Sequence, residues 1–122
     1  MTTILIVDDE YLIADILSYA LEDEGYLTVT AGSGQRALTI LEREQPQLII
    51  TDYMMPGMNG IEFAEAVREH KLLHSVPILL MSGAQAHLGI GRPDLFLKVF
   101  DKPFGIHEVV SAIKALVPPD QA

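Results

Sequence analysis

Short apolar runs alternate with amphipathic segments along almost the whole chain, and this alternation constrains the fold more than any other feature of the sequence. Five runs are rich in branched or aromatic apolar residues, at 4–7, 27–31, 48–51, 78–81 and 96–101. Continuous apolar runs of this length are typical of strands buried on both faces of a parallel sheet. The segments between them mostly have the hydrophobic spacing of helices. Together they predict an α/β fold, a doubly wound parallel sheet of five strands with helices on both faces.

The segments between the runs carry recognisable helix boundaries. Gly25 is expected to end the first helix, and Ser33 to cap a second helix that ends before Pro46. The exception is the stretch between Ser82 and Phe96, which is rich in glycine and also contains a proline. Because parallel strands need a long connection, a fourth helix is still expected there. We predict that it is short, irregular or mobile.

Composition narrows the class of protein further. The 122 residues include eight Lys and Arg against seventeen Asp and Glu, a formal net charge of −9 that disfavours direct nucleic-acid binding. The absence of cysteine excludes disulfides and thiolate chemistry. No apolar stretch approaches the roughly 20 residues of a membrane span, and the start of the chain lacks the features of a signal peptide. We expect one cytoplasmic domain over 1–122, with a core at about 4–117 and a tail or the start of a linker at 118–122.

Polar residues follow four of the five expected strands at the point where each strand ends. Asp8 and Asp9 follow the first strand, Asp52 the third, Ser82 the fourth and Lys102 the fifth. In open parallel sheets, binding sites form outside the carboxyl ends of the strands. Neighbouring strands lie only about 4.8 Å apart. We therefore expect these five side chains to converge on one site.

Three carboxylates in one crevice repel one another. At the effective dielectric of a protein surface, each pair at about 4 Å costs on the order of 4 kcal/mol. A cation, or a proton on one carboxylate, must relieve this repulsion. Oxygen ligands in this number suit Mg²⁺. With Lys102 adding positive charge, such a site fits phosphoryl transfer, in which charge on the moving group is neutralised and a nucleophile is positioned.

Four ordered motifs resemble the receiver domain of two-component response regulators, of the kind found in chemotaxis regulators. They are ILIVDDE at 4–10, DYMMPGMNG at 52–60, MSGA at 81–84 and DKPF at 101–104. The resemblance runs from about 4 to 116. It implies a flavodoxin-like sheet with strand order 2-1-3-4-5. It also implies a phosphoacceptor that contributes to its own phosphorylation and dephosphorylation, not an enzyme.

The resemblance assigns a role to each acidic residue of the site. Asp52 is the residue phosphorylated from a phosphohistidine of a sensor histidine kinase or a histidine phosphotransfer protein. Asp9 and Asp52 hold Mg²⁺ through their carboxylates. Asp8 acts mainly through water, and Met54 supplies its backbone carbonyl. The apolar side chain of Met54 lies where relatives place polar groups near the acyl phosphate, which predicts slow self-dephosphorylation.

The resemblance also implies how phosphorylation is read out. Ser82 is the hydroxyl that moves to bind the new phosphoryl group, and Lys102 is the ion-pairing lysine, in a peptide bond to Pro103 that is typically cis. The aromatic switch of the family is replaced here by Val99. Phe100 is adjacent, but alternation along a strand aims it at the opposite face. The conformational change is expected to signal a downstream effector or output domain that the sequence does not identify.

Two other functions are compatible with the same residues. One is a Mg²⁺-dependent phosphatase with an aspartate nucleophile, although such enzymes usually carry a second acid two residues later, where this chain has Met54. The other is an interaction module that works without phosphorylation. Phosphorylation by acetyl phosphate and turnover of phosphate esters would separate the three.

Overall fold

The strands form one parallel sheet, seen in the computed structural model, which describes residues 2–83 and 86–119. Its strand order is β2-β1-β3-β4-β5, as predicted. The strands are β1 (Thr3–Val7), β2 (Leu27–Ala31), β3 (Leu48–Asp52), β4 (Ile78–Ser82) and β5 (Lys98–Asp101). The predicted doubly wound α/β fold is therefore confirmed.

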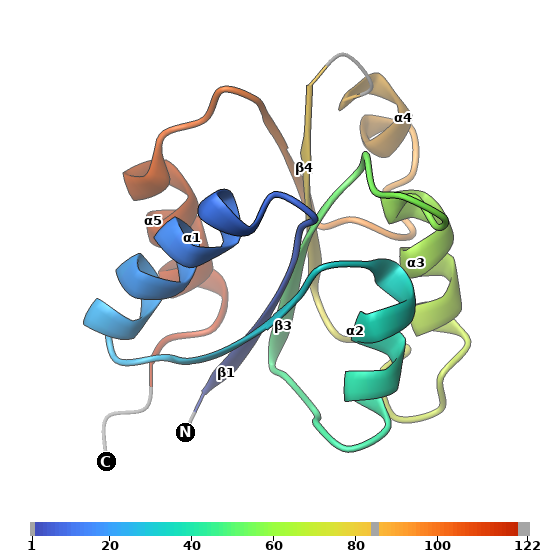
Figure 1. Ribbon diagram of the computed structural model, residues 1–122, viewed down its shortest axis with the longest axis horizontal. Helices are drawn as coiled ribbons and strands as arrows, with labels where there is room; N and C mark the ends of the chain where they lie inside the picture. Colours follow the sequence, from blue (N-terminus) through green and yellow to red (C-terminus); the bar gives the residue numbers. More distant parts are fainter. Residues whose placement is uncertain (1, 84–85, 120–122) are drawn as a thin grey trace.

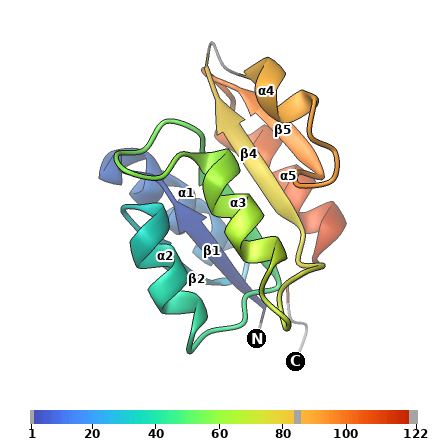
Figure 2. The same cartoon turned by 90° about the vertical axis from the view of Figure 1, so that its right-hand side faces the viewer.

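Helices cover both faces of this sheet, as Figures 1 and 2 show. One face carries α1 (Tyr11–Asp23) and α5 (Ile106–Leu116), and the other carries α2 (Gly34–Leu41), α3 (Gly60–Arg68) and α4 (Ala86–Ile90). Each face encloses its own apolar core because successive strand side chains point to opposite sides. On β1, for example, Ile4 and Ile6 pack toward α1 and α5, whereas Leu5 and Val7 join the other core.

Local sequence signals end α1 and start α2 as predicted, and a further signal starts α3. Ser33 caps α2 by accepting a hydrogen bond from the backbone N–H of Arg36, at 3.2 Å. Gly25 follows α1 with a φ of 100°, a left-handed conformation that glycine adopts without strain. At the start of α3, Asn59 and Glu62 form a capping box in which each side chain accepts from the other residue's backbone.

The connection from β4 to β5 differs in part from a regular crossover. Its helix, α4, has only five residues, which confirms the prediction of a short helix; residues 84 and 85 lie outside the described part. The strand expected from residue 96 begins at Lys98. The reason is that the N–H of Phe96 is used by a turn, donating to the carbonyl of Arg92 at 3.1 Å, while the ring of Phe96 still packs into the core.

Arg68, at the end of α3, ties two loops to this helix. Its guanidinium donates to the carbonyl of Val76 at 2.6 Å and to that of Leu95 at 2.8 Å. Burial lowers the pKa of this guanidinium from its ordinary value, an effect that the nearby Asp94 partly opposes. Arg68 thus anchors the segment between α4 and β5 to α3.

Among the described residues, no helix combines the length and the apolar character that crossing a bilayer would require.

Candidate functional site

The carboxyl ends of β1, β3, β4 and β5 bring polar side chains to one edge of the sheet. Asp52 is the last residue of β3 and Ser82 the last of β4, while Asp8 and Lys102 directly follow β1 and β5. The Nζ atom of Lys102 lies 3.1 Å from Asp52 Oδ1 and 4.0 Å from Asp8 Oδ2. Residues more than forty positions apart in sequence therefore share one ion-paired cluster.

The start of α3 packs tightly against the strand that carries Asp52. A Cβ atom on Gly60 would lie 2.5 Å from the backbone oxygen of Asp52 and 3.0 Å from Tyr53 Cα. The N–H of Gly60 also donates to the carbonyl of Tyr53 at 2.8 Å. Only glycine permits this approach, so Gly60 lets α3 hold the end of β3 in place.

Three polar side chains of the site are almost completely buried. Asp8, Asp52 and Ser82 are 2%, 3% and 1% exposed. Asp8 Oδ1 accepts a hydrogen bond from the backbone N–H of Glu10 at 2.9 Å. Asp8 Oδ2 and Ser82 Oγ have no hydrogen-bond partner. A buried polar atom without a partner costs free energy. A ligand that bonded to Asp8 Oδ2 and Ser82 Oγ would remove this cost.

Burial and charge shift the ionisation of these groups. Burial raises the pKa of Asp8 from 3.8 to about 6, assisted by the negative charge of Asp52 and opposed by the backbone hydrogen bond from Glu10. Burial also raises the pKa of Asp52, although the hydrogen bond and charge of Lys102 oppose this. Burial alone would lower the pKa of Lys102, but the hydrogen bond and charge of Asp52, together with the two other acids, raise it overall. Without a cation, the site holds more negative charge than it can easily solvate.

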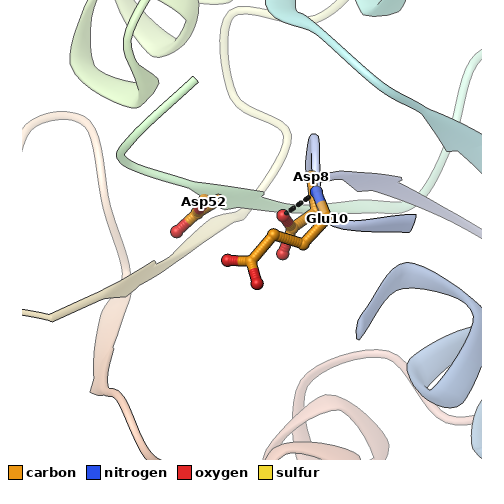
Figure 3. A group of neighbouring side chains, drawn as sticks. All are labelled: Asp8, Glu10 and Asp52. Carbon is orange, nitrogen blue, oxygen red and sulfur yellow. Dashed lines mark hydrogen bonds between the residues drawn. The ribbon is translucent and has the colours of Figure 1, made fainter. Parts of the chain in front are cut away.

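Glu10 is a member of the acidic cluster that sequence reasoning missed. Carboxylate oxygens of Asp8, Glu10 and Asp52 lie within 4.8 Å of one another. Figure 3 shows the Glu10 side chain reaching from the end of β1 toward Asp52. Its Oε1 lies 3.5 Å from Lys102 Nζ. The sequence signal for Glu10 was its place as the third acid in the run after β1. The sequence does not show, however, in which direction the side chain of a residue before a helix points.

The other predicted site residues occupy more varied positions. Asp9 is exposed and is not one of the three clustered carboxylates. Its negative charge still raises the pKa of Asp52, as the weakest of several causes. Met54 is 62% exposed. The peptide bond between Lys102 and Pro103 is cis.

The structure confirms the predicted alternation at β5. Phe100 is buried in the core beneath α1 and α5, whereas Val99 packs against the opposite core. There Val99 lies close to α4, because a Cβ atom on Gly89 would come 3.2 Å from Val99 Cγ2 and would overlap Leu80. The position that the resemblance assigns to an aromatic switch is thus occupied by an aliphatic contact between β5 and α4.

The donor set of the site suits a hard divalent cation. It consists of carboxylate oxygens, and the buried Asp8 Oδ2 lacks a hydrogen-bond partner. Mg²⁺ prefers oxygen ligands and usually keeps several waters when one or two carboxylates hold it. The residues present therefore fit Mg²⁺.

Sequence relatives agree with this geometry. The family described as the response regulator receiver domain matches residues 4–114. The alkaline phosphatase synthesis transcriptional regulatory protein PhoP of Bacillus subtilis is 38% identical over 120 residues, which cover 93% of this chain and 48% of PhoP. Sporulation initiation phosphotransferase F of the same organism is 36% identical over 115 residues, which cover 94% of this chain and 93% of that protein.

A solved structure adds the same result at the level of the fold. Response regulator protein TrrA of Thermotoga maritima, solved in complex with Mg²⁺-BeF, matches with a TM-score of 0.84 at 30% identity. The match covers 96% of this chain and all of TrrA, at 100%. By contrast, the chain spans about half the length of PhoP, at 48%. With the family match, the sheet order and the acidic site taken together, the chain belongs to the response regulator receiver domains of two-component signal transduction.

Proposed function

We propose that this receiver domain accepts a phosphoryl group on Asp52 from the phosphohistidine of a sensor kinase or a histidine phosphotransfer protein. The observation that carries the proposal is the 3.1 Å contact between Lys102 Nζ and Asp52 Oδ1 inside the acidic cluster. A lysine held against a buried carboxylate is placed to neutralise charge that a transferring phosphoryl group brings. Family membership favours this function over a phosphatase or a phosphorylation-independent module.

Asp8, Asp9, Asp52 and the backbone carbonyl of Met54 are the proposed holders of Mg²⁺. Support comes from the oxygen donors and from the unpartnered Asp8 Oδ2. When bound, Mg²⁺ supplies positive charge that stabilises the phosphoryl oxygens during transfer. Asp9 is exposed and lies outside the acidic cluster, but its charge acts on Asp52.

In the proposed transfer, a carboxylate oxygen of Asp52 forms the new bond to phosphorus. The bond between phosphorus and the imidazole nitrogen of the donor breaks, and its electron pair stays on that nitrogen. Lys102 neutralises negative charge on the phosphoryl oxygens. The domain thus contributes to its own phosphorylation. It also contributes to its own dephosphorylation, in which water attacks phosphorus, the bond between phosphorus and the Asp52 oxygen breaks, and inorganic phosphate leaves. It acts as a phosphoacceptor and not as an enzyme with a separate substrate.

We further propose that Ser82 carries the signal outward. Its buried Oγ has no hydrogen-bond partner before phosphorylation, so a phosphoryl oxygen would give it one. Ser82 ends β4, and the connection after it leads to α4, where Gly89 packs on Val99. Movement of Ser82 would therefore shift α4 against β5 and alter the surface that a downstream effector meets.

The wider assignment follows from the relatives. We propose that residues 4–117 are the core of a single cytoplasmic receiver domain. The proline-containing segment from 118 is either a tail or the start of a linker, of which 120–122 lie outside the described residues. PhoP, which is about twice as long as the matched region, is a transcriptional regulator. An output domain of this kind would supply nucleic-acid binding that this acidic domain lacks.

Incubation with Mg²⁺ and acetyl phosphate, followed by intact-protein mass spectrometry, tests the phosphoacceptor. We expect one added phosphoryl group on the wild-type chain and none on Asp52→Asn. Asp101→Asn is the matched control, because Asp101 is an exposed acid at the end of β5, and it should be modified like the wild type. Modification of Asp52→Asn to the same extent, or an unmodified wild-type chain, would refute the proposal.

A further inference from the structure

Glu10 occupies the mouth of the site, where the proposed function leaves it without a role. Its side chain is 61% exposed, whereas those of Asp8 and Asp52 are 0% and 5% exposed. Its carboxylate nevertheless lies in the same cluster as theirs and contacts Lys102 at 3.5 Å. Glu10 also lines a groove of about 460 Å³ that opens beside Lys102. A phosphodonor approaching from this side therefore meets the charge of Glu10 before it reaches Asp52.

We propose that Glu10 is a specificity-determining residue that disfavours small, highly charged anionic phosphodonors. The inference rests on the proposed phosphorylation of Asp52 and concerns which donors reach it. A fixed negative charge repels a donor in proportion to the charge the donor carries. Acetyl phosphate carries no cationic group with which to neutralise Glu10. A protein donor can place a cationic or hydrogen-bonding side chain against it, because most of the Glu10 side chain is exposed.

The size of the effect follows from the spacing of the cluster. The carboxylate oxygens lie within 4.8 Å of one another, and phosphorus at Asp52 is one bond further out. At about 6 Å and in the dielectric of water, one unit of charge changes a rate by about threefold, and two units change it by about tenfold. A buried charge would act more strongly, because the dielectric around it is lower. Glu10 is exposed, so the figures for the dielectric of water apply. With either dielectric, a donor of charge −2 is slowed more than a donor of charge −1.

The experiment compares two small donors on the full chain at saturating Mg²⁺. At neutral pH acetyl phosphate is a dianion, which releases acetate on transfer, and phosphoramidate carries a single net negative charge and releases ammonia. Glu10→Gln removes the charge and keeps the size of the side chain. We expect phosphorylation of Asp52 to accelerate about tenfold with acetyl phosphate and about threefold with phosphoramidate. The matched control Glu22→Gln removes an equal charge from the exposed end of α1 and should change neither rate appreciably.

Two further measurements separate this role from others. The gain in Glu10→Gln should shrink as ionic strength rises, because salt screens an exposed charge. The same field attracts cations, so Mg²⁺ affinity, followed by NMR shifts of residues around Asp52, should fall about tenfold. A fall of a hundredfold or more would identify Glu10 as a direct ligand and would overturn the proposal.

Three results in Glu10→Gln would each overturn the inference while wild-type phosphorylation still stood. They are an equal acceleration of transfer from both donors, no acceleration with either donor, and slower transfer. Failure of the wild-type chain to be phosphorylated by either donor would instead refute the proposed function, and the inference with it. Circular dichroism of both glutamine variants shows whether the fold is intact. Because the comparison is between donors on one variant, a general change in stability moves both rates together and cannot imitate the expected pattern.

Discussion

Replacement of Asp8 by Asn should stabilise the metal-free protein at neutral pH. Asp8 is 2% exposed, and one of its two carboxylate oxygens has no hydrogen-bond partner. Asn has nearly the same shape, and its Oδ1 can still accept the hydrogen bond from Glu10 N–H. The substitution therefore removes a poorly solvated charge without opening a cavity.

The magnitude follows from the ionisation of Asp8. Burial raises its pKa from 3.8 to about 6, and each tenfold change in proton affinity is worth about 1.4 kcal/mol. Between these pH values the folded chain binds a proton that the unfolded chain does not, so wild-type stability falls as pH rises through this window. Asp8→Asn lacks this loss. Its advantage should be nearly absent below pH 4 and reach about 3 kcal/mol above pH 7, as an upper value.

Urea unfolding followed by circular dichroism, with EDTA present, measures this difference at pH 4, 5 and 7.5. Asp9→Asn is the matched control, because it removes the adjacent but exposed carboxylate and should change stability by less than about 1 kcal/mol. Addition of Mg²⁺ should stabilise the wild type more than Asp8→Asn, since a ligand that binds only the folded state adds stability in proportion to its affinity. The reasoning would be refuted if Asp8→Asn were no more stable than the wild type at pH 7.5. It would also be refuted if the gain in stability over the wild type were as large at pH 4 as at pH 7.5.

Three other substitutions test how the site is supported. Gly60→Ala should destabilise the fold by about 1–3 kcal/mol, because its Cβ would press on the backbone oxygen of Asp52 at 2.5 Å; Gly32→Ala, with open space around it, should have little effect in the same urea titration. Asn59→Ala removes the capping box of α3 and should cost about 1 kcal/mol, so an unchanged unfolding midpoint would contradict the cap. Arg68→Met leaves two loop carbonyls without their donor and should cost about 1–3 kcal/mol. It should also speed proteolytic cleavage between α4 and β5. Equal cleavage rates in the variant and the wild type would argue that Arg68 does not anchor this segment.

Local patterns were sufficient to predict much of this molecule. Apolar runs buried on both faces predicted the strands of a parallel sheet, and Ser33 and Gly25 predicted helix boundaries that the structure confirms. The poor helix composition before β5 predicted the short α4. These predictions succeeded because each depends on residues within one turn or one strand. The start of β5 was misplaced by two residues, since the N–H of Phe96 bonds to a turn that no local pattern reveals.

The sequence by itself determined which residues stand at the strand ends, because strand length and the alternation of β and α segments place them there. Only the tertiary structure decided what those residues do to one another. It turned Glu10 into the acidic cluster, left Asp9 outside it, and set Lys102 between carboxylates that come from different strands. It also buried Asp8 deeply enough to raise its pKa. Charge interactions and desolvation depend on distances across the sheet, and those distances exist only once the chain has folded.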